Sequence, residues 1–194
     1  MQLNLPELRR RLARRSAPEF AVYGDDGARP EGNTAAAVLV PVVARPEGLT
    51  VLFTQRTIHL KSHSGQVSFP GGRVEPGDAS AEFTALREAE EEIGLRPEGV
   101  EILARLPEYH TRTGFRVTPV VGLLTPPFEL VPDRREVEEI FEVPLAFLLD
   151  ERNQQRRTRE FQGQTVGFYV FEYQDRTIWG ATAAMVVNLY RMLA

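Results

Sequence analysis

The sequence predicts one α+β domain, and three features of the chain support this prediction. Its 194 residues, 42% hydrophobic and 26% charged, suit a globular domain with a substantial core. Short apolar runs rich in β-branched residues are interspersed with segments of helical spacing. No repeat, low-complexity tract or interdomain linker divides the chain. Residues 1–194 are therefore expected to form a single domain.

The N-terminal part is predicted to contain one helix and three strands. Leucines at positions 3, 5, 8 and 12 have amphipathic spacing, so a short helix is expected over residues 6–15. The polar residues 23–33, which include glycine and proline, are expected to form a loop. Apolar runs predict strands over residues 35–43, 49–56 and 66–69. The first two are joined by a turn, and the third ends at Pro70-Gly71-Gly72.

The central helix is predicted over residues 80–93. Ser80 is suited to cap its N-terminus, Gly94 suits its C-terminus, and Pro97 prevents much further extension. The remaining predicted elements are strands over residues 101–106, 116–124 and 137–143, a short helix over 144–149, a hairpin of 158–161 and 165–173, and a final helix over 181–193.

The composition excludes several classes of function. The absence of cysteine removes disulfide scaffolds, thiolate zinc sites and cysteine nucleophiles. The formal net charge of −4 argues against a nucleic-acid partner, and no apolar run is long enough to span a membrane. The N-terminal segment lacks the apolar core of a secretory signal, so a cytoplasmic location is expected. The oligomeric state is left open.

The acidic part of the central helix is the strongest candidate for chemistry. Residues three and four apart share a helix face, so Glu88, Glu91 and Glu92 converge on one side. The apolar residues Leu86, Ala89 and Ile93 group on the opposite side. A hard divalent cation, Mg²⁺ or Mn²⁺, would offset the repulsion between these carboxylates. The alternative is that the helix presents an ordinary solvated acidic surface.

The stretch from Gly72 to residue 95 resembles the Nudix box. Residues 87–95, Arg-Glu-Ala-Glu-Glu-Glu-Ile-Gly-Leu, match the second half of that motif position by position, although Ala89 is small for an aliphatic position. The first half departs from it. Asp78 stands where the motif has a glutamate after Gly72, and eight residues rather than seven then precede Arg87. This departure leaves the role of Asp78 open.

The resemblance implies a Nudix fold, an α/β/α sandwich with a mixed sheet. It also implies metal-dependent hydrolysis of a nucleoside diphosphate linked to another group. Glu88 and Glu92 would be metal ligands, and Glu91 a third ligand or the general base. Arg87 would orient a glutamate through a charge-assisted hydrogen bond, or would be an ordinary surface ion pair. The candidate catalytic residues are therefore Glu88, Glu91 and Arg87.

A second stretch, residues 52–72, looks like the signature of the coenzyme A pyrophosphatase branch. Its matching positions are Thr54, Arg56, Gly65 and Phe69 to Gly72. Thr57 and Lys61 depart from the signature, and Lys61 keeps the charge but loses the bidentate fork of arginine. Residues 113–122, 136–145 and 178–183 also resemble this branch. The implied substrate is the small nucleotide coenzyme A or one of its thioesters.

Several positions have two interpretations in this framework. Arg56 and Lys61, with Gly71 and Gly72, are the candidate substrate contacts, although either charge alone could equally be solvent-exposed. Trp179 could stack on adenine but more often such a residue belongs to the core. The glutamates that follow residue 135 include possible additional bases. ADP-ribose or another nucleoside diphosphate derivative is the alternative substrate, and a non-catalytic nucleotide-binding module is the alternative to an enzyme.

Overall fold

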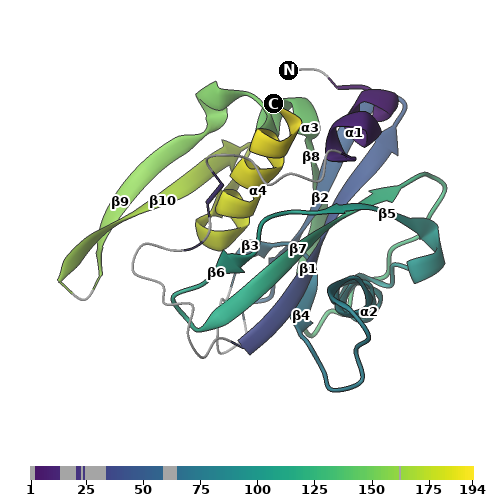
Figure 1. Ribbon diagram of the computed structural model, residues 1–194, viewed down its shortest axis with the longest axis horizontal. Helices are drawn as coiled ribbons and strands as arrows, with labels where there is room; N and C mark the ends of the chain where they lie inside the picture. The colour runs from purple at the N-terminus through teal and green to yellow at the C-terminus, as the bar shows by residue number, and fades with distance from the viewer. Residues whose placement is uncertain (1–2, 14–20, 23, 25–33, 59–64, 162) are drawn as a thin grey trace.

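The computed structural model describes residues 3–13, 21–22, 24, 34–58, 65–161 and 163–194 (Figure 1). Its helices are α1 (Leu5–Leu12), α2 (Ala81–Ile93), α3 (Leu145–Leu148) and α4 (Gly180–Leu193). Its strands are β1 (Thr34–Arg45), β2 (Gly48–Arg56), β3 (Val67–Ser68), β4 (Gly71–Arg73), β5 (Val100–Arg105), β6 (Tyr109–His110), β7 (Phe115–Leu124), β8 (Val137–Pro144), β9 (Gln155–Phe161), β10 (Gln164–Tyr173) and β11 (Arg176–Trp179). Short 3₁₀ turns lie at Pro97–Gly99 and Glu151–Asn153.

The described strands form two sheets. The main sheet has the order β3-β2-β1-β7-β5, with β4 paired to β1, β6 to β7 and β8 to β2. Strands β1 and β7 are parallel over the register from Thr34–Phe115 to Val43–Leu124, whereas the other pairings are antiparallel. The smaller sheet is antiparallel, in the order β11-β10-β9. The main sheet is therefore mixed, as predicted.

Helices cover both faces of the main sheet, and β1 supplies the core on each side. Its residues Ala37 and Leu39 pack with Ala89 and Ile93 of α2 in one fully buried cluster. Alternate residues of β1, such as Val40, belong to a larger cluster that includes α1 and α4. This alternation follows from the two-residue repeat of a strand. The result is a helix–sheet–helix sandwich.

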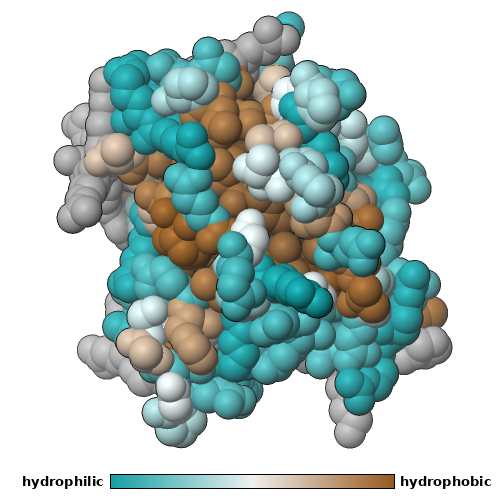
Figure 2. All heavy atoms as spheres, turned by 90° about the vertical axis from the view of Figure 1, so that its right-hand side faces the viewer, coloured by the Kyte–Doolittle hydropathy of each residue, from teal (hydrophilic) through white to brown (hydrophobic). Residues whose placement is uncertain are grey.

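The side of the molecule formed by α2 and β5 faces the viewer in Figure 2, where an apolar area lies among hydrophilic side chains. Phe83 of α2 and Ile102 of β5 are 50% and 36% exposed. Glu82 and Arg105 connect the same two elements through an ion pair of 2.5 Å.

Among the described residues, no helix is long and apolar enough to cross a membrane.

The local signals for α2 are confirmed. The Ser80 hydroxyl accepts a hydrogen bond from the Phe83 amide at 3.2 Å, and Gly94 ends the helix with φ of 67°. This positive φ favours glycine because it has no Cβ. The N-terminal helix begins at Leu5, where the Asn4 side chain caps it, and ends at Leu12. The rest of the predicted span to residue 15 largely lies outside the described residues, as does most of the predicted loop 23–33.

Three short strands, β4, β6 and β11, are absent from the sequence prediction. They contain two to four residues each, and β4 is two-thirds glycine. Such segments carry no hydrophobic alternation, and their strand geometry comes from pairing with β1, β7 and β10. The strand β4 matters most, because it places the glycine pair beside α2.

Candidate active site

Gly71 and Gly72 of β4 lie between β1 of the main sheet and α2, the helix that carries the candidate carboxylates. A Cβ atom on Gly71 would lie 2.4 Å from the carbonyl oxygen of Ala37 in β1. A Cβ atom on Gly72 would lie 2.4 Å from Oε1 of Glu88. Both distances are far below van der Waals contact, so neither position can hold a side chain without movement. The glycines therefore let the Glu88 carboxylate pack directly against the β4 backbone.

Glu92 is the buried carboxylate of this site, with 6% of the residue exposed. Burial raises the pKa of Glu92 to about 8, against an opposing effect of the Arg56 guanidinium, whose Nη1 lies 3.7 Å from Oε1. Nearby Glu136 and Glu88 raise this pKa further, and a backbone hydrogen bond from Gly71 lowers it. Glu92 thus occupies a place where its own charge is poorly compensated by the protein.

Glu88 lies one helical turn before Glu92 and is also shielded, with a side chain that is 17% exposed. Burial raises the pKa of Glu88, while Arg87, at 3.0 Å from Oε1, lowers it. The charges of Glu91 and Glu136 raise it further. The neighbouring arginines therefore offset only part of the cost of ionising these carboxylates.

Glu136, immediately before β8, joins the site from a distant part of the chain. Its Oε2 lies 3.8 Å from Nη2 of Arg56, which also approaches Glu92. From the sequence, Glu136 was only one of several possible bases, because nothing in its local sequence distinguishes it from Glu138 or Glu139. The antiparallel pairing of β8 with β2 brings it to Arg56.

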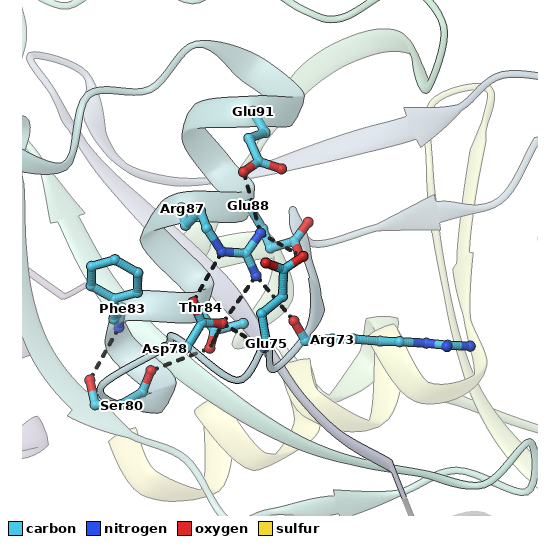
Figure 3. Close-up of polar contacts among 9 residues, drawn as sticks. All are labelled: Arg73, Glu75, Asp78, Ser80, Phe83, Thr84, Arg87, Glu88 and Glu91. Carbon is cyan, nitrogen blue, oxygen red and sulfur yellow. Dashed lines mark hydrogen bonds and ion pairs between the residues drawn. The ribbon is translucent and has the colours of Figure 1, made fainter.

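Arg87 and Asp78 form a second layer behind these carboxylates (Figure 3). The guanidinium donates to both Asp78 oxygens at 3.2 and 3.1 Å and to the Arg73 carbonyl oxygen at 3.1 Å. Asp78 also accepts from the Thr84 hydroxyl at 2.8 Å and the Glu75 amide at 2.9 Å. The hydrogen bonds from Arg87 hold the pKa of Asp78 well below its usual range. Asp78 therefore anchors Arg87, despite the extra residue and shorter side chain.

Glu91 is placed differently from the other two helix glutamates. Its side chain is 62% exposed, and its Oε1 lies 3.4 Å from Nη1 of Arg87. Figure 3 shows it above Glu88 on the outer part of the helix. Among the described residues, no three His, Asp or Glu side chains are arranged so that they could hold a metal ion as they stand. Of the predicted set, the structure brings Glu88 and Glu92 together beside β4 and leaves Glu91 at the rim.

The donor set nevertheless fits a hard divalent cation. Glu88, Glu92 and Glu136 each present carboxylate oxygens, the ligand type preferred by Mg²⁺ and similar ions. The raised pKa values of Glu88 and Glu92 reflect burial and mutual repulsion, both of which a bound cation would relieve. These residues suit a metal site at the edge of β4.

A cavity of about 700 Å³ opens beside Gly71 and Gly72. It extends from β4 between the two sheets to the β9–β10 hairpin and the start of α4, where the Thr182 hydroxyl donates to the Val67 carbonyl at 3.2 Å. Its described lining includes no aspartate or glutamate. The lining has four arginines, Arg56, Arg73, Arg112 and Arg159, and five aromatic side chains, Phe69, Phe115, Phe161, Phe168 and Trp179.

This cavity contains the residues that sequence reasoning did not identify. Arg73, Arg112 and Arg159 come from three separated segments, and only the packing of the two sheets brings them together. Trp179 is half-buried and lines the cavity, whereas its sequence context favoured the core. Arg56, a candidate substrate contact in the sequence analysis, also lines it, and its buried Nε has no hydrogen-bond partner in the described structure. Lys61 lies outside the described residues.

The NUDIX domain family matches residues 33–164 of this chain. The Uncharacterized Nudix hydrolase NudL of Photorhabdus laumondii is 42% identical over 159 residues, covering 82% of this chain and 84% of that protein. The protein of the same name from Escherichia coli K12 is 43% identical over 155 residues, covering 79% of this chain and 80% of that protein.

Solved structures show the same architecture. The Nudix hydrolase RenU from M. smegmatis superposes with a TM-score of 0.51 at 26% identity, covering 66% of this chain and 81% of that chain. DR0079 from Deinococcus radiodurans has a TM-score of 0.53 at 14% identity, covering 84% of this chain and 88% of that chain, and so supports the fold alone. The predicted Nudix fold is confirmed.

Proposed function

This chain belongs to the NUDIX domain family as a Nudix hydrolase of nucleotide diphosphate derivatives, and we propose that its substrate is coenzyme A or one of its thioesters. The reaction would cleave the diphosphate into adenosine 3′,5′-bisphosphate and 4′-phosphopantetheine, or its acyl form. Nudix hydrolases act on phosphoanhydride bonds and generally use divalent metal ions. The proposal concerns the identity of the substrate and the residues that act on it.

The single observation that carries the substrate assignment is the cavity beside Gly71 and Gly72. It has four arginines and no acidic residue in its described lining, although the whole chain has a net charge of −4. A volume of about 700 Å³ is in the range of nucleotide-sized sites. Such a cavity suits a ligand with several negative charges and an aromatic base. Coenzyme A has both, since it carries a 3′-phosphate besides its diphosphate.

We assign the reacting diphosphate to the β4 edge of this cavity. Gly71 and Gly72 line the cavity there, and Arg56 and Lys61 are the proposed anion contacts. Glu88 and Glu92, with Glu91 or Glu136 as a further ligand, would hold Mg²⁺ or Mn²⁺, which would neutralise phosphoryl charge and lower the pKa of bound water. Glu91 at the rim, or Glu88, would accept the proton of the attacking water.

Arg87 is proposed to act through Glu88. Asp78 holds the guanidinium in place, so that Nη1 stays 3.0 Å from Glu88 Oε1. This arrangement fixes the carboxylate rotamer without placing Arg87 on the substrate.

The substrate is tested by turnover with a panel of diphosphates in Mg²⁺ or Mn²⁺. Coenzyme A, acetyl-coenzyme A, ADP-ribose and a dinucleoside tetraphosphate would be compared at equal concentrations. Mass spectrometry of the products should show adenosine 3′,5′-bisphosphate, and kcat/KM should be highest for a coenzyme A compound. A higher kcat/KM for ADP-ribose would overturn the substrate assignment while leaving the hydrolase assignment in place.

A further inference from the structure

Two arginines of the cavity, Arg73 and Arg159, differ from most others in the molecule in what surrounds them. Elsewhere arginines pair with carboxylates, as in Arg45–Glu142, Arg105–Glu82 and Arg157–Glu172, at 2.5 to 2.6 Å. In the cavity, Arg73 instead lies over the ring of Phe115, at 5.3 Å from the ring centroid. Figure 3 shows the Arg73 side chain extending away from the carboxylate cluster.

Arg159 on β9 is the clearest case. Its guanidinium lies 5.6 Å from the centroid of Phe161, 5.8 Å from that of Phe168 and 5.4 Å from that of Trp179. Within the described part of the chain, no carboxylate forms an ion pair with it. Arg157, two residues earlier on the same strand, instead pairs with Glu172 at 2.6 Å.

Three aromatic rings hold the Arg159 cation without neutralising it. The attraction between a cation and a ring face positions the guanidinium, but a ring offers no strong acceptor for its N–H groups. The planar donor fork of arginine matches a phosphate, to which it can donate two hydrogen bonds. The surroundings of Arg159 therefore suit an anionic ligand within the cavity.

The position of Arg159 separates it from the bond that is cleaved. It belongs to the smaller sheet, whereas the carboxylates belong to α2 on the opposite face of the main sheet (Figure 1). Both Arg159 and Gly72 line the same cavity, which reaches from β4 to the β9–β10 hairpin. A ligand with its diphosphate at β4 would reach Arg159 with one of its ends.

Resting on the proposed function, we propose that Arg159 determines specificity by binding the 3′-phosphate at the nucleoside end of the substrate. The pantetheine end of coenzyme A carries no charge, so the acid-free, arginine-lined part of the cavity is matched by the nucleoside end. Phe168 and Trp179 hold the guanidinium for this contact. A nucleoside diphosphate derivative without a further phosphate would leave Arg159 without its ligand.

The test compares coenzyme A with 3′-dephospho-coenzyme A in wild type, Arg159→Gln and Arg159→Lys, with Arg157→Gln as the matched control. A charge-assisted contact favours the phosphorylated substrate by about 10- to 150-fold in kcat/KM. Arg159→Gln should remove most of that ratio, Arg159→Lys should retain part of it, and Arg157→Gln should leave it as in wild type. Calorimetry of adenosine 3′,5′-bisphosphate and AMP without metal should show the same loss of discrimination in binding.

The outcomes separate the inference from the proposed function. If wild type cleaves both compounds without preference, or if Arg159→Gln keeps the wild-type ratio, the inference is overturned and the proposed function stands. If Arg159→Gln lowers kcat/KM for both compounds equally, Arg159 stabilises the hairpin or stacks on the base, and the inference is again overturned. If wild type cleaves neither compound, the proposed function fails and the inference fails with it.

Discussion

At the scale of single residues, the site combines buried negative charge with missing side chains. Glu92 is almost fully buried, although an uncompensated carboxylate in such a place is unfavourable. Gly72 lacks a side chain where any Cβ would meet the Glu88 carboxylate. Together these features keep the Glu88 and Glu92 carboxylates beside the β4 backbone. Each can be changed by a single substitution.

Replacing Glu88 or Glu92 with glutamine should lower kcat by at least about 100-fold, the scale of losing metal or general-base assistance. Folding should persist because glutamine keeps the volume and removes a buried or repelling charge. Glu90→Gln, an exposed position on the same helix, is the control. Steady-state kinetics and circular dichroism measure the two effects. Full activity in either folded variant would contradict the assignment.

Gly72→Ala should lower kcat by about 100-fold without changing any charge, because displacing a catalytic group by about 1 Å has effects of that size. The new Cβ would start 2.4 Å from Glu88 Oε1, so the carboxylate must move. Gly77→Ala, in the loop that follows, meets no atom within 4 Å and is the matched control. Equal activity of the two variants would show that the position of Glu88 is not critical.

At the scale of elements, α2 was predictable and β4 was not. The caps of α2 and its carboxylate spacing are local properties, so Ser80, Gly94 and the Glu88–Glu92 pair followed from the sequence. The strand β4, by contrast, is defined by its pairing with β1, and the contact of Asp78 with Arg87 depends on how the intervening loop folds. The sequence could thus indicate the candidate ligands but not the surface against which they pack.

The attachment of α2 to β5 should depend on pH. The hydrogen bond from Arg105 lowers the pKa of Glu82 to about 2, from a usual value of 4.5. The pair therefore contributes fully above pH 4.5, and its contribution is lost as the pH falls towards 2. Because Arg105 is 53% exposed, the ion pair contributes only about 0.2–1 kcal/mol to the free energy of unfolding.

Glu82→Gln should accordingly lower the free energy of unfolding by that amount at pH 7 and by less at pH 3. Urea titrations at the two pH values measure the difference. The double variant with Arg105→Gln serves as control, since removing the second partner should add little. An equal loss at both pH values would rule out the ion pair as the source.

At the scale of the whole molecule, the cavity is a product of topology. Its arginines and rings come from β2, the segment between β3 and β4, β4, the segment before β7, β7 itself, the β9–β10 hairpin and β11, which line one cavity because the two sheets pack together. No sequence period links Arg73, Arg112 and Arg159, so the lining could not be predicted. The resemblance to known motifs supplied Arg56 and the glycine pair, whereas Arg159 required the three-dimensional arrangement.

A divalent cation should stabilise the whole fold, because a ligand that binds only the native state raises the apparent stability with its concentration. Thermal melts with increasing Mg²⁺ or Mn²⁺ should show a rising Tm in wild type. The rise should shrink in the Glu88→Gln, Glu92→Gln double variant. An identical rise in both proteins would place the cation elsewhere.

The parallel pairing of β1 with β7 has a consequence for how the chain acquires its site. These strands are separated in sequence by β2, β4, α2 and β5, so their alignment closes a long loop, which is slow compared with forming a helix. The acidic helix, whose hydrogen bonds are local, can therefore form before this pairing is complete. During refolding, metal capture should follow helix formation as a separate, later phase, so that the loaded site marks a completed fold.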